Sequence, residues 1–192
     1  MPDRLQGYRT PARLMHWIVA AAVLLMIPAG IVMIREGIPR TLQDGLFLFH
    51  KNTGVLLFPL ILARLAYRLR HPPPPLPPSL PAWQRRAAAL SHGALYALLI
   101  AMPVTGFVRV RAGGFPIELL DRLGAGPWLA KSEALAGVAK GLHALGAFAL
   151  IGLLAVHVGA ALHHALIRRD GVWARIWPPV ARRGPDAPAG RP

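Results

Sequence analysis

The sequence predicts an all-α membrane protein built as a bundle of four transmembrane helices. Of its 192 residues, 54% are hydrophobic and only 16% are charged, whereas soluble domains carry about 25% charged residues. The mean hydropathy is +0.43. Four apolar stretches are also long enough to cross a hydrocarbon core, which takes about 20 residues in a helix. Their Ala, Leu, Val and Ile residues do not alternate with polar ones as in a strand, so each stretch is expected to be helical.

The expected spans cover residues 14–34, 45–63, 87–108 and 142–167. Pro28, Pro59 and Pro103 lie inside the first three, where a proline removes one helical hydrogen bond and favours a kink. The second span is the least apolar because Lys51 and Asn52 lie within it. The fourth is interrupted only by histidines, which makes it the most informative span for function.

The connections differ in composition. Residues 71–81 contain a run of prolines that excludes a helix and predicts a stiff extended spacer. Residues 109–140 form the longest polar connection. A short surface helix is expected near 117–123, and any long helix is broken by Gly113, Gly114, Gly124 and Gly126. We expect residues 1–177 to form the membrane domain and residues 178–192, rich in Pro, Ala and Arg, to form a disordered tail.

The chain contains no cysteine. This excludes disulfides, iron–sulfur clusters, cysteine-based zinc sites and covalent haem attachment through C-x-x-C-H. No G-x-G-x-x-G, P-loop or nucleophile elbow occurs either, so nucleotide, phosphoryl and acyl-transfer chemistry are not supported. Any metal centre must therefore use His, carboxylate or Met ligands.

Positive charge predicts the orientation. The formal net charge is +14, and the arginines flank the apolar stretches, so we expect anionic lipid head groups rather than nucleic acid as the partner. The N-terminus, the 64–86 connection and the C-terminus hold 14 of the 22 Lys and Arg residues. Four spans put these three segments on one side, and the positive-inside rule makes that side cytoplasmic.

Five of the eight histidines lie well within the expected spans. Ionisable side chains are costly there and are functional candidates by default. On the fourth span, His143 and His157 are 14 residues apart, which places them about 40° apart around the helix and about 21 Å apart along it. One helix face therefore presents two imidazoles, one near each membrane surface.

Depth predicts a partner for each of these imidazoles. His16 begins the first span at the cytoplasmic end, and His50 lies near the outer end of the second. Depth therefore pairs His50 with His143 and His16 with His157. Two bis-imidazole sites at different depths are what two b-type haems require.

Three further histidines leave alternatives open. His164 is the reserve ligand for the inner site, whereas His163 lies on the opposite face of its helix. The pair they form is expected to reach the head groups, a haem propionate or a quinone. His92 is a ligand, a propionate partner, a quinone hydrogen-bond donor, or simply a histidine bonded to a neighbouring helix.

Taken together, these segments resemble the bacterial cytochrome b561 family of four-helix dihaem membrane cytochromes. The resemblance covers residues 8–177 and is carried by RLMHW at 13–17, FHKNTG at 49–54, RLAYR at 64–68 before His71 and the prolines, SHG at 91–93, AMPVTG at 101–106, HVGAALHH at 157–164 and RDG at 169–171. It implies non-covalent ligation of two haems b by His16, His50, His143 and His157.

The resemblance also implies an oxidoreductase of the bacterial inner membrane that passes electrons from an outer-face donor, with superoxide favoured, to ubiquinone. Lys51 and Lys140 lie one and three residues from outer histidines, and we expect them, with Arg40, to attract a small anion. The alternative is that these lysines reach toward the interface or pair with haem propionates. The inner residues Arg13, His92, His163 and His164 are the candidate quinone cluster.

Two other functions remain open. The first is a cytochrome b subunit that passes electrons from a partner dehydrogenase or hydrogenase to quinone. The second is a transporter of metal ions or protons, but its histidines would have to converge on one pathway, whereas these pair at two depths.

Overall fold

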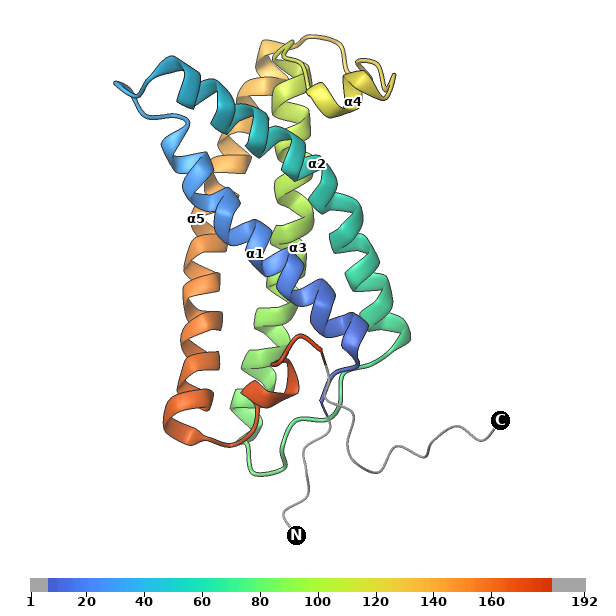
Figure 1. Ribbon diagram of the computed structural model, residues 1–192, viewed down its shortest axis with the longest axis vertical. Helices are drawn as coiled ribbons and strands as arrows, with labels where there is room; N and C mark the ends of the chain where they lie inside the picture. Colours follow the sequence, from blue (N-terminus) through green and yellow to red (C-terminus); the bar gives the residue numbers. More distant parts are fainter. Residues whose placement is uncertain (1–6, 181–192) are drawn as a thin grey trace.

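Four long helices and one short one are followed by two brief helical turns, and no strand occurs in residues 7–180, the part of the chain described by this computed structural model. The elements are α1 (Thr10–Val32), α2 (Arg40–Arg70), α3 (Ala82–Ala112), α4 (Glu118–Arg122), α5 (Glu133–Leu162), a π-helical turn (His163–Arg168) and a 3-10 turn (Trp173–Arg175). Figure 1 shows the long helices side by side, with α4 at one end of the bundle. We call this the α4 end and the opposite one the terminal end.

All four expected spans are present as helices long and apolar enough to cross a membrane. The prediction of an all-α four-span membrane bundle is therefore confirmed. Each of the expected spans 45–63 and 87–108 is longer in the structure, where α2 and α3 have 31 residues. A helix of this length extends beyond a hydrocarbon core of about 30 Å, so its polar ends reach the head-group region.

Proline and glycine mark where the helices begin and end. Pro39 and Pro81 directly precede α2 and α3, and α3 ends at Ala112, before Gly113 and Gly114, the second of which has a φ of +78°. Proline has no N–H to leave unpaired at a helix start, and glycine adopts a positive φ at little cost. α5 instead begins at Ser132, whose Oγ accepts a hydrogen bond from the Leu135 N–H at 3.3 Å.

The buried hydrophobic core of the bundle is small. Its core cluster consists of Val19, Val23, Leu57, Ile61, Leu95 and Leu150. Large apolar side chains such as Leu25, Leu90 and Phe148 are instead at least 60% exposed. Such a surface would aggregate in water but is the natural outer face of a bundle surrounded by lipid.

The connections agree with their composition. Residues 72–76 have no regular structure, as expected for the proline run. The expected surface helix near 117–123 is confirmed by α4. Of the expected tail 178–192, only 178–180 lie within the described residues.

The terminal end is closed by the chain folding back on itself (Figure 1). The Tyr8 N–H donates to the Arg175 carbonyl at 2.9 Å, and Trp17 Nε1 donates to the Ile176 carbonyl at 3.1 Å. Arg13 is buried between the carbonyls of Tyr8 and Pro178, at 2.7 and 3.0 Å. The last described residues therefore hold the start of α1.

Candidate functional site

At the α4 end, His50 on α2 faces His143 on α5; we call them the α4-end pair. Their ring centroids are 6.2 Å apart and their planes are inclined at 76°. In the described chain the closely packed long helices are α3 with α5, α1 with α2, and α2 with α3. The two imidazoles therefore face each other from helices that are not one of these closely packed pairs.

Two glycines make room for this pair. A Cβ placed on Gly30 of α1 would lie 2.9 Å from Cε1 of His50, and one on Gly106 of α3 would lie 3.1 Å from Cε1 of His143. Carbon atoms in contact normally stay about 3.5–4.0 Å apart. Each ring thus leans on a neighbouring helix at a position where only glycine fits without a shift.

Backbone carbonyls orient the rings of the α4-end pair. Nδ1 of His50 lies 3.2 Å from the Met26 carbonyl, and Nδ1 of His143 lies 3.1 Å from the Met102 carbonyl and 3.1 Å from the Thr105 hydroxyl. A carbonyl only accepts, so the proton of each neutral ring belongs on Nδ1. Nε2 then carries the lone pair that a metal binds, as in most metal-ligating histidines.

The terminal-end pair consists of His16 on α1 and His157 on α5. Their centroids are 6.4 Å apart, with planes inclined at 65°. A third imidazole, that of His92 on α3, has its centroid 5.5 Å from that of His157. The edge of Trp17 also contacts the ring of His16 at a centroid distance of 5.2 Å.

Arg64 changes the environment of His16. Its Nη2 lies 3.1 Å from Nδ1 of His16, and its Nη1 donates to the Ala12 carbonyl at 3.0 Å. Because arginine only donates, Nδ1 of His16 must act as the acceptor here. Arg64 and Arg68 also lie over the ring of Tyr96, 5.8 and 5.9 Å from its centroid. This end of the bundle is therefore cationic around its histidines.

The spacing of both pairs fits a shared metal between the rings. A first-row metal binds a histidine nitrogen at about 2.0–2.1 Å, and two rings that ligate it from opposite sides have centroids about 6.4 Å apart. The described residues contain no group of three or more His, Asp or Glu side chains placed to hold a bare ion. Each pair thus supplies two ligands, the number that a bis-imidazole haem takes from its protein.

The fit differs between the two ends. The α4-end pair has both Nδ1 atoms on acceptors and fits as it stands. At the terminal end, Arg64 occupies both Nδ1 of His16 and the Ala12 carbonyl, which is the natural acceptor for that nitrogen one helical turn away. Nδ1 of His16 would have to be released from Arg64 before Nε2 of this ring could hold a haem as the α4-end rings can.

A sequence profile of the prokaryotic cytochrome b561 family matches residues 7–179, nearly the whole chain. The chain belongs to the prokaryotic cytochrome b561 family. Membership implies b-type haem binding and electron transfer within the membrane, in agreement with the facing imidazoles. The resemblance inferred from the sequence is therefore confirmed at the level of the family.

Curated relatives align over most of their length. Cytochrome b561 homolog 2 of Escherichia coli (strain K12) is 32% identical over 165 residues, which are 84% of this chain and 86% of the relative. Cytochrome b561 homolog 1 of the same strain is 29% identical over 166 residues, 85% of this chain and 93% of the relative. A Yersinia pestis protein named probable superoxide oxidase CybB is 26% identical over 163 residues, 85% of this chain and 91% of that protein.

The candidate quinone residues of this cytochrome b561 have different partners in the structure. Arg13 is bonded to backbone carbonyls, His92 contacts His157, and Nδ1 of His164 lies 2.6 Å from Oδ2 of Asp170. His163 is exposed, and its ring lies 5.9 Å from that of His164, centroid to centroid. Within residues 7–180, no hydrogen bond or ring contact joins any two of Arg13, His92 and His164.

Lys51 and Lys140 are placed differently from each other. Nζ of Lys51 lies 2.6 Å from Oε1 of Glu118 and donates to the Pro116 carbonyl at 2.8 Å, so a carboxylate balances its charge. Lys140 is exposed on α5. Arg40, which the sequence grouped with them, is also exposed and lies 3.5 Å from Asp44.

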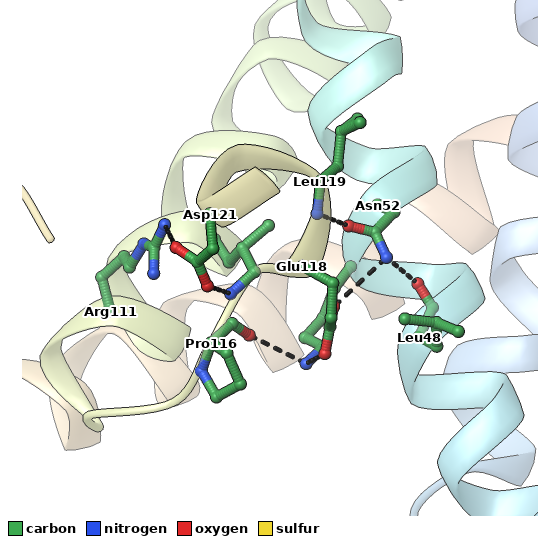
Figure 2. Close-up of polar contacts among 9 residues, drawn as sticks. Leu48, Asn52, Arg111, Pro116, Glu118, Leu119 and Asp121 are labelled. Carbon is green, nitrogen blue, oxygen red and sulfur yellow. Dashed lines mark hydrogen bonds and ion pairs between the residues drawn. The ribbon is translucent and has the colours of Figure 1, made fainter. Parts of the chain in front are cut away.

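The contact of Lys51 belongs to a polar network that holds α4 against α2 (Figure 2). Asn52 accepts from the Leu119 N–H at 2.9 Å and donates to Glu118 at 3.2 Å, while Arg111 and Asp121 are 2.6 Å apart. Burial alone raises the pKa of the Glu118 carboxyl, but hydrogen bonds from Lys51 and Asn52 and the charge of Lys51 outweigh it, so that pKa lies below its usual value.

Sequence reasoning missed several residues around the two pairs. Thr105, Gly30 and Gly106 contact the α4-end rings, and Arg109 is near enough to act electrostatically on both. Thr105 and Arg109 are four residues apart, so they lie one helical turn apart on the same face of α3. This spacing is a signal that the sequence alone offers. The carboxylate partner of Lys51 had no such signal, since it lies 67 residues away.

Proposed function

We propose that this cytochrome b561 is a dihaem oxidoreductase that passes electrons from a donor at the outer face to ubiquinone. The residues that would hold the two haems are His50 with His143 and His16 with His157. The observation that carries this proposal is the two imidazole pairs, with centroids 6.2 and 6.4 Å apart. Bound haem supplies one-electron chemistry between ferric and ferrous iron at each pair.

α5 connects the two sites. It contributes His143 to one pair and His157 to the other, 14 residues further along the same helix. That separation is about 21 Å along the axis, so one helix links the two levels of the bundle. A chain with ligands at two depths can deliver an electron across the membrane rather than along its surface.

The proposed orientation places the α4 end outside the cell and both termini in the cytoplasm of a bacterium, with the protein in the inner membrane. The distribution of Lys and Arg supports it. The favoured donor is superoxide, which the name of the Yersinia pestis relative suggests. Lys140 and Lys51 are the proposed attractors for this anion, although the ion pair with Glu118 offsets the charge of Lys51.

Ubiquinone is the proposed acceptor, at the terminal end near Arg13, His92 and His164. Two superoxide anions each lose one electron to give two molecules of oxygen, and one ubiquinone takes up both electrons and two protons to give ubiquinol. The His164–Asp170 pair, 2.6 Å between Nδ1 and Oδ2, can hold one of these protons.

The test is a reduced-minus-oxidised visible spectrum of the purified protein with haem quantified per chain, followed by superoxide addition with and without ubiquinone. We expect two haems b per chain, reduced by superoxide and reoxidised by ubiquinone. Two haems that ignore superoxide but exchange electrons with quinone would favour the alternative, a cytochrome b subunit fed by a partner dehydrogenase or hydrogenase. A protein without haem would overturn both.

A further inference from the structure

Arg109 lies on the α3 face that supports the α4-end pair. It follows Gly106 by three residues and Thr105 by four, and both of these contact the ring of His143. Residues three and four apart share one helix face, so Arg109 lies one turn closer to the α4 end on that face. Its charge acts on the rings of both His50 and His143.

The neighbouring cations at this end are neutralised by carboxylates. Lys51 pairs with Glu118 and Arg111 pairs with Asp121, each at 2.6 Å. Arg109 has neither a hydrogen bond nor an ion pair from its side chain to any residue in the described range 7–180. The two acidic side chains of α4 are thus committed to other partners.

Arg109 also differs from the unpaired cations further out. Lys131 and Lys140 are exposed, whereas Arg109 is only partly exposed. Water and salt screen an exposed charge within about 8–10 Å, and a partly buried charge is screened much less. Among these cations, Arg109 is therefore the one whose positive charge is least neutralised by carboxylates and least screened by solvent at the α4-end pair.

We propose that Arg109 determines the charge preference of the electron donor at the α4 end: its uncompensated guanidinium favours an anionic one-electron donor over a cationic one. This inference rests on the proposed function, since it requires a redox centre at His50 and His143. The donor loses one electron and the centre gains it, so no other reactant is needed.

The test compares Arg109→Gln with the wild-type protein, using ferrous EDTA as an anionic one-electron donor and hexaammineruthenium(II) as a cationic one of similar potential. The measured quantity is the ratio of their haem-reduction rates, which cancels changes in haem content or driving force. We expect the anionic-to-cationic ratio to fall by about three- to tenfold at low salt and by less at high salt. Arg109→Lys should restore the ratio.

Arg122→Gln is the matched control, because Arg122 is an exposed cation on nearby α4. An equilibrium redox titration provides a second readout: loss of a nearby positive charge should lower the midpoint potential of the α4-end haem and leave the other unchanged. An Arg109→Gln protein with an unchanged ratio and unchanged potentials would overturn this inference. The proposed function would fail separately, through a wild-type protein that lacks haem or does not reduce ubiquinone.

Discussion

The two ends of the bundle hold their histidines in opposite ways. At the α4 end, ring nitrogens meet backbone carbonyls and the nearby cations Lys51 and Arg111 are paired with carboxylates. At the terminal end, Nδ1 of His16 meets Arg64, and Arg68 lies one turn further along α2. The comparison teaches that one fold can present two similar imidazole pairs in different electrostatic surroundings, which is how a protein separates the potentials of two equal cofactors.

The largest effect should follow from removing one ligand of one pair. His143→Ala should reduce the haem content from two per chain to one and abolish reduction by an outer-face donor, while the remaining haem still exchanges electrons with quinol. Pyridine haemochrome quantification and visible spectra measure this. His163→Ala, which removes an exposed ring outside both pairs, should retain both haems. Full haem content in His143→Ala would contradict the ligand assignment.

Glycine contacts offer a second way to separate the two ends. Gly30→Ala and Gly106→Ala add a Cβ against His50 and His143, at 2.9 and 3.1 Å, and should lower haem occupancy at the α4 end only. Overpacking of this kind costs about 1–3 kcal/mol. Gly152→Ala on α5 is the matched control, because nothing lies within 4 Å of its added Cβ. Equal haem loss in the control would show that the loss does not come from crowding of the His50 and His143 rings.

A substitution of Arg64 tests how the terminal-end pair sets the potential of its haem. Arg64→Gln removes the donor that faces Nδ1 of His16 and frees the Ala12 carbonyl for that ring. We expect both haems to remain and the potential of the terminal-end haem to fall, because a positive charge near the iron favours its reduced state. Redox titration followed at the α-band resolves the two haems. If the terminal-end haem were lost, Arg64 would instead be a residue that holds the cofactor.

The smallest effect concerns pH at α4. The pKa of Glu118 lies below its usual value in the folded protein, so its contribution to docking α4 is fully present above the usual glutamate value of about 4.3 and is lost as the pH falls through the lowered pKa. Hydrogen exchange at residues 117–122 should therefore be protected equally at pH 8 and pH 5, after correction for intrinsic rates, and accelerate below pH 4. Glu118→Gln should remove this dependence; its persistence would assign the effect to Asp121.

The sequence predicted the existence of the four spans and α4 because hydropathy and glycine positions determine them. The helices α2 and α3 extend beyond the apolar stretches, because α2 starts directly after Pro39 and α3 fills the chain between Pro81 and Gly113 rather than stopping where hydropathy falls. Depth along the helices was enough to predict which histidines face each other. A one-dimensional count of residues gives depth reliably when the helices cross the same membrane.

The partners of individual side chains could not be predicted by counting residues along the helices. The partner of Lys51 depends on how a helix of five residues docks on α2 through Asn52 and Glu118. The contact between Arg64 and His16 depends on the rotation of α1 and α2 about their own axes. Both are set by packing between elements far apart in the chain, so neither leaves a trace in local periodicity.

α5 has a further consequence for how the protein is made. Among the described long helices it is the last in chain order, and it carries one member of each histidine pair. With the proposed ligands, neither haem can be held from both sides until this helix has entered the bilayer. Haem insertion then follows the membrane integration of α5, and a chain truncated before residue 143 would leave each haem with a single ligand, His16 or His50.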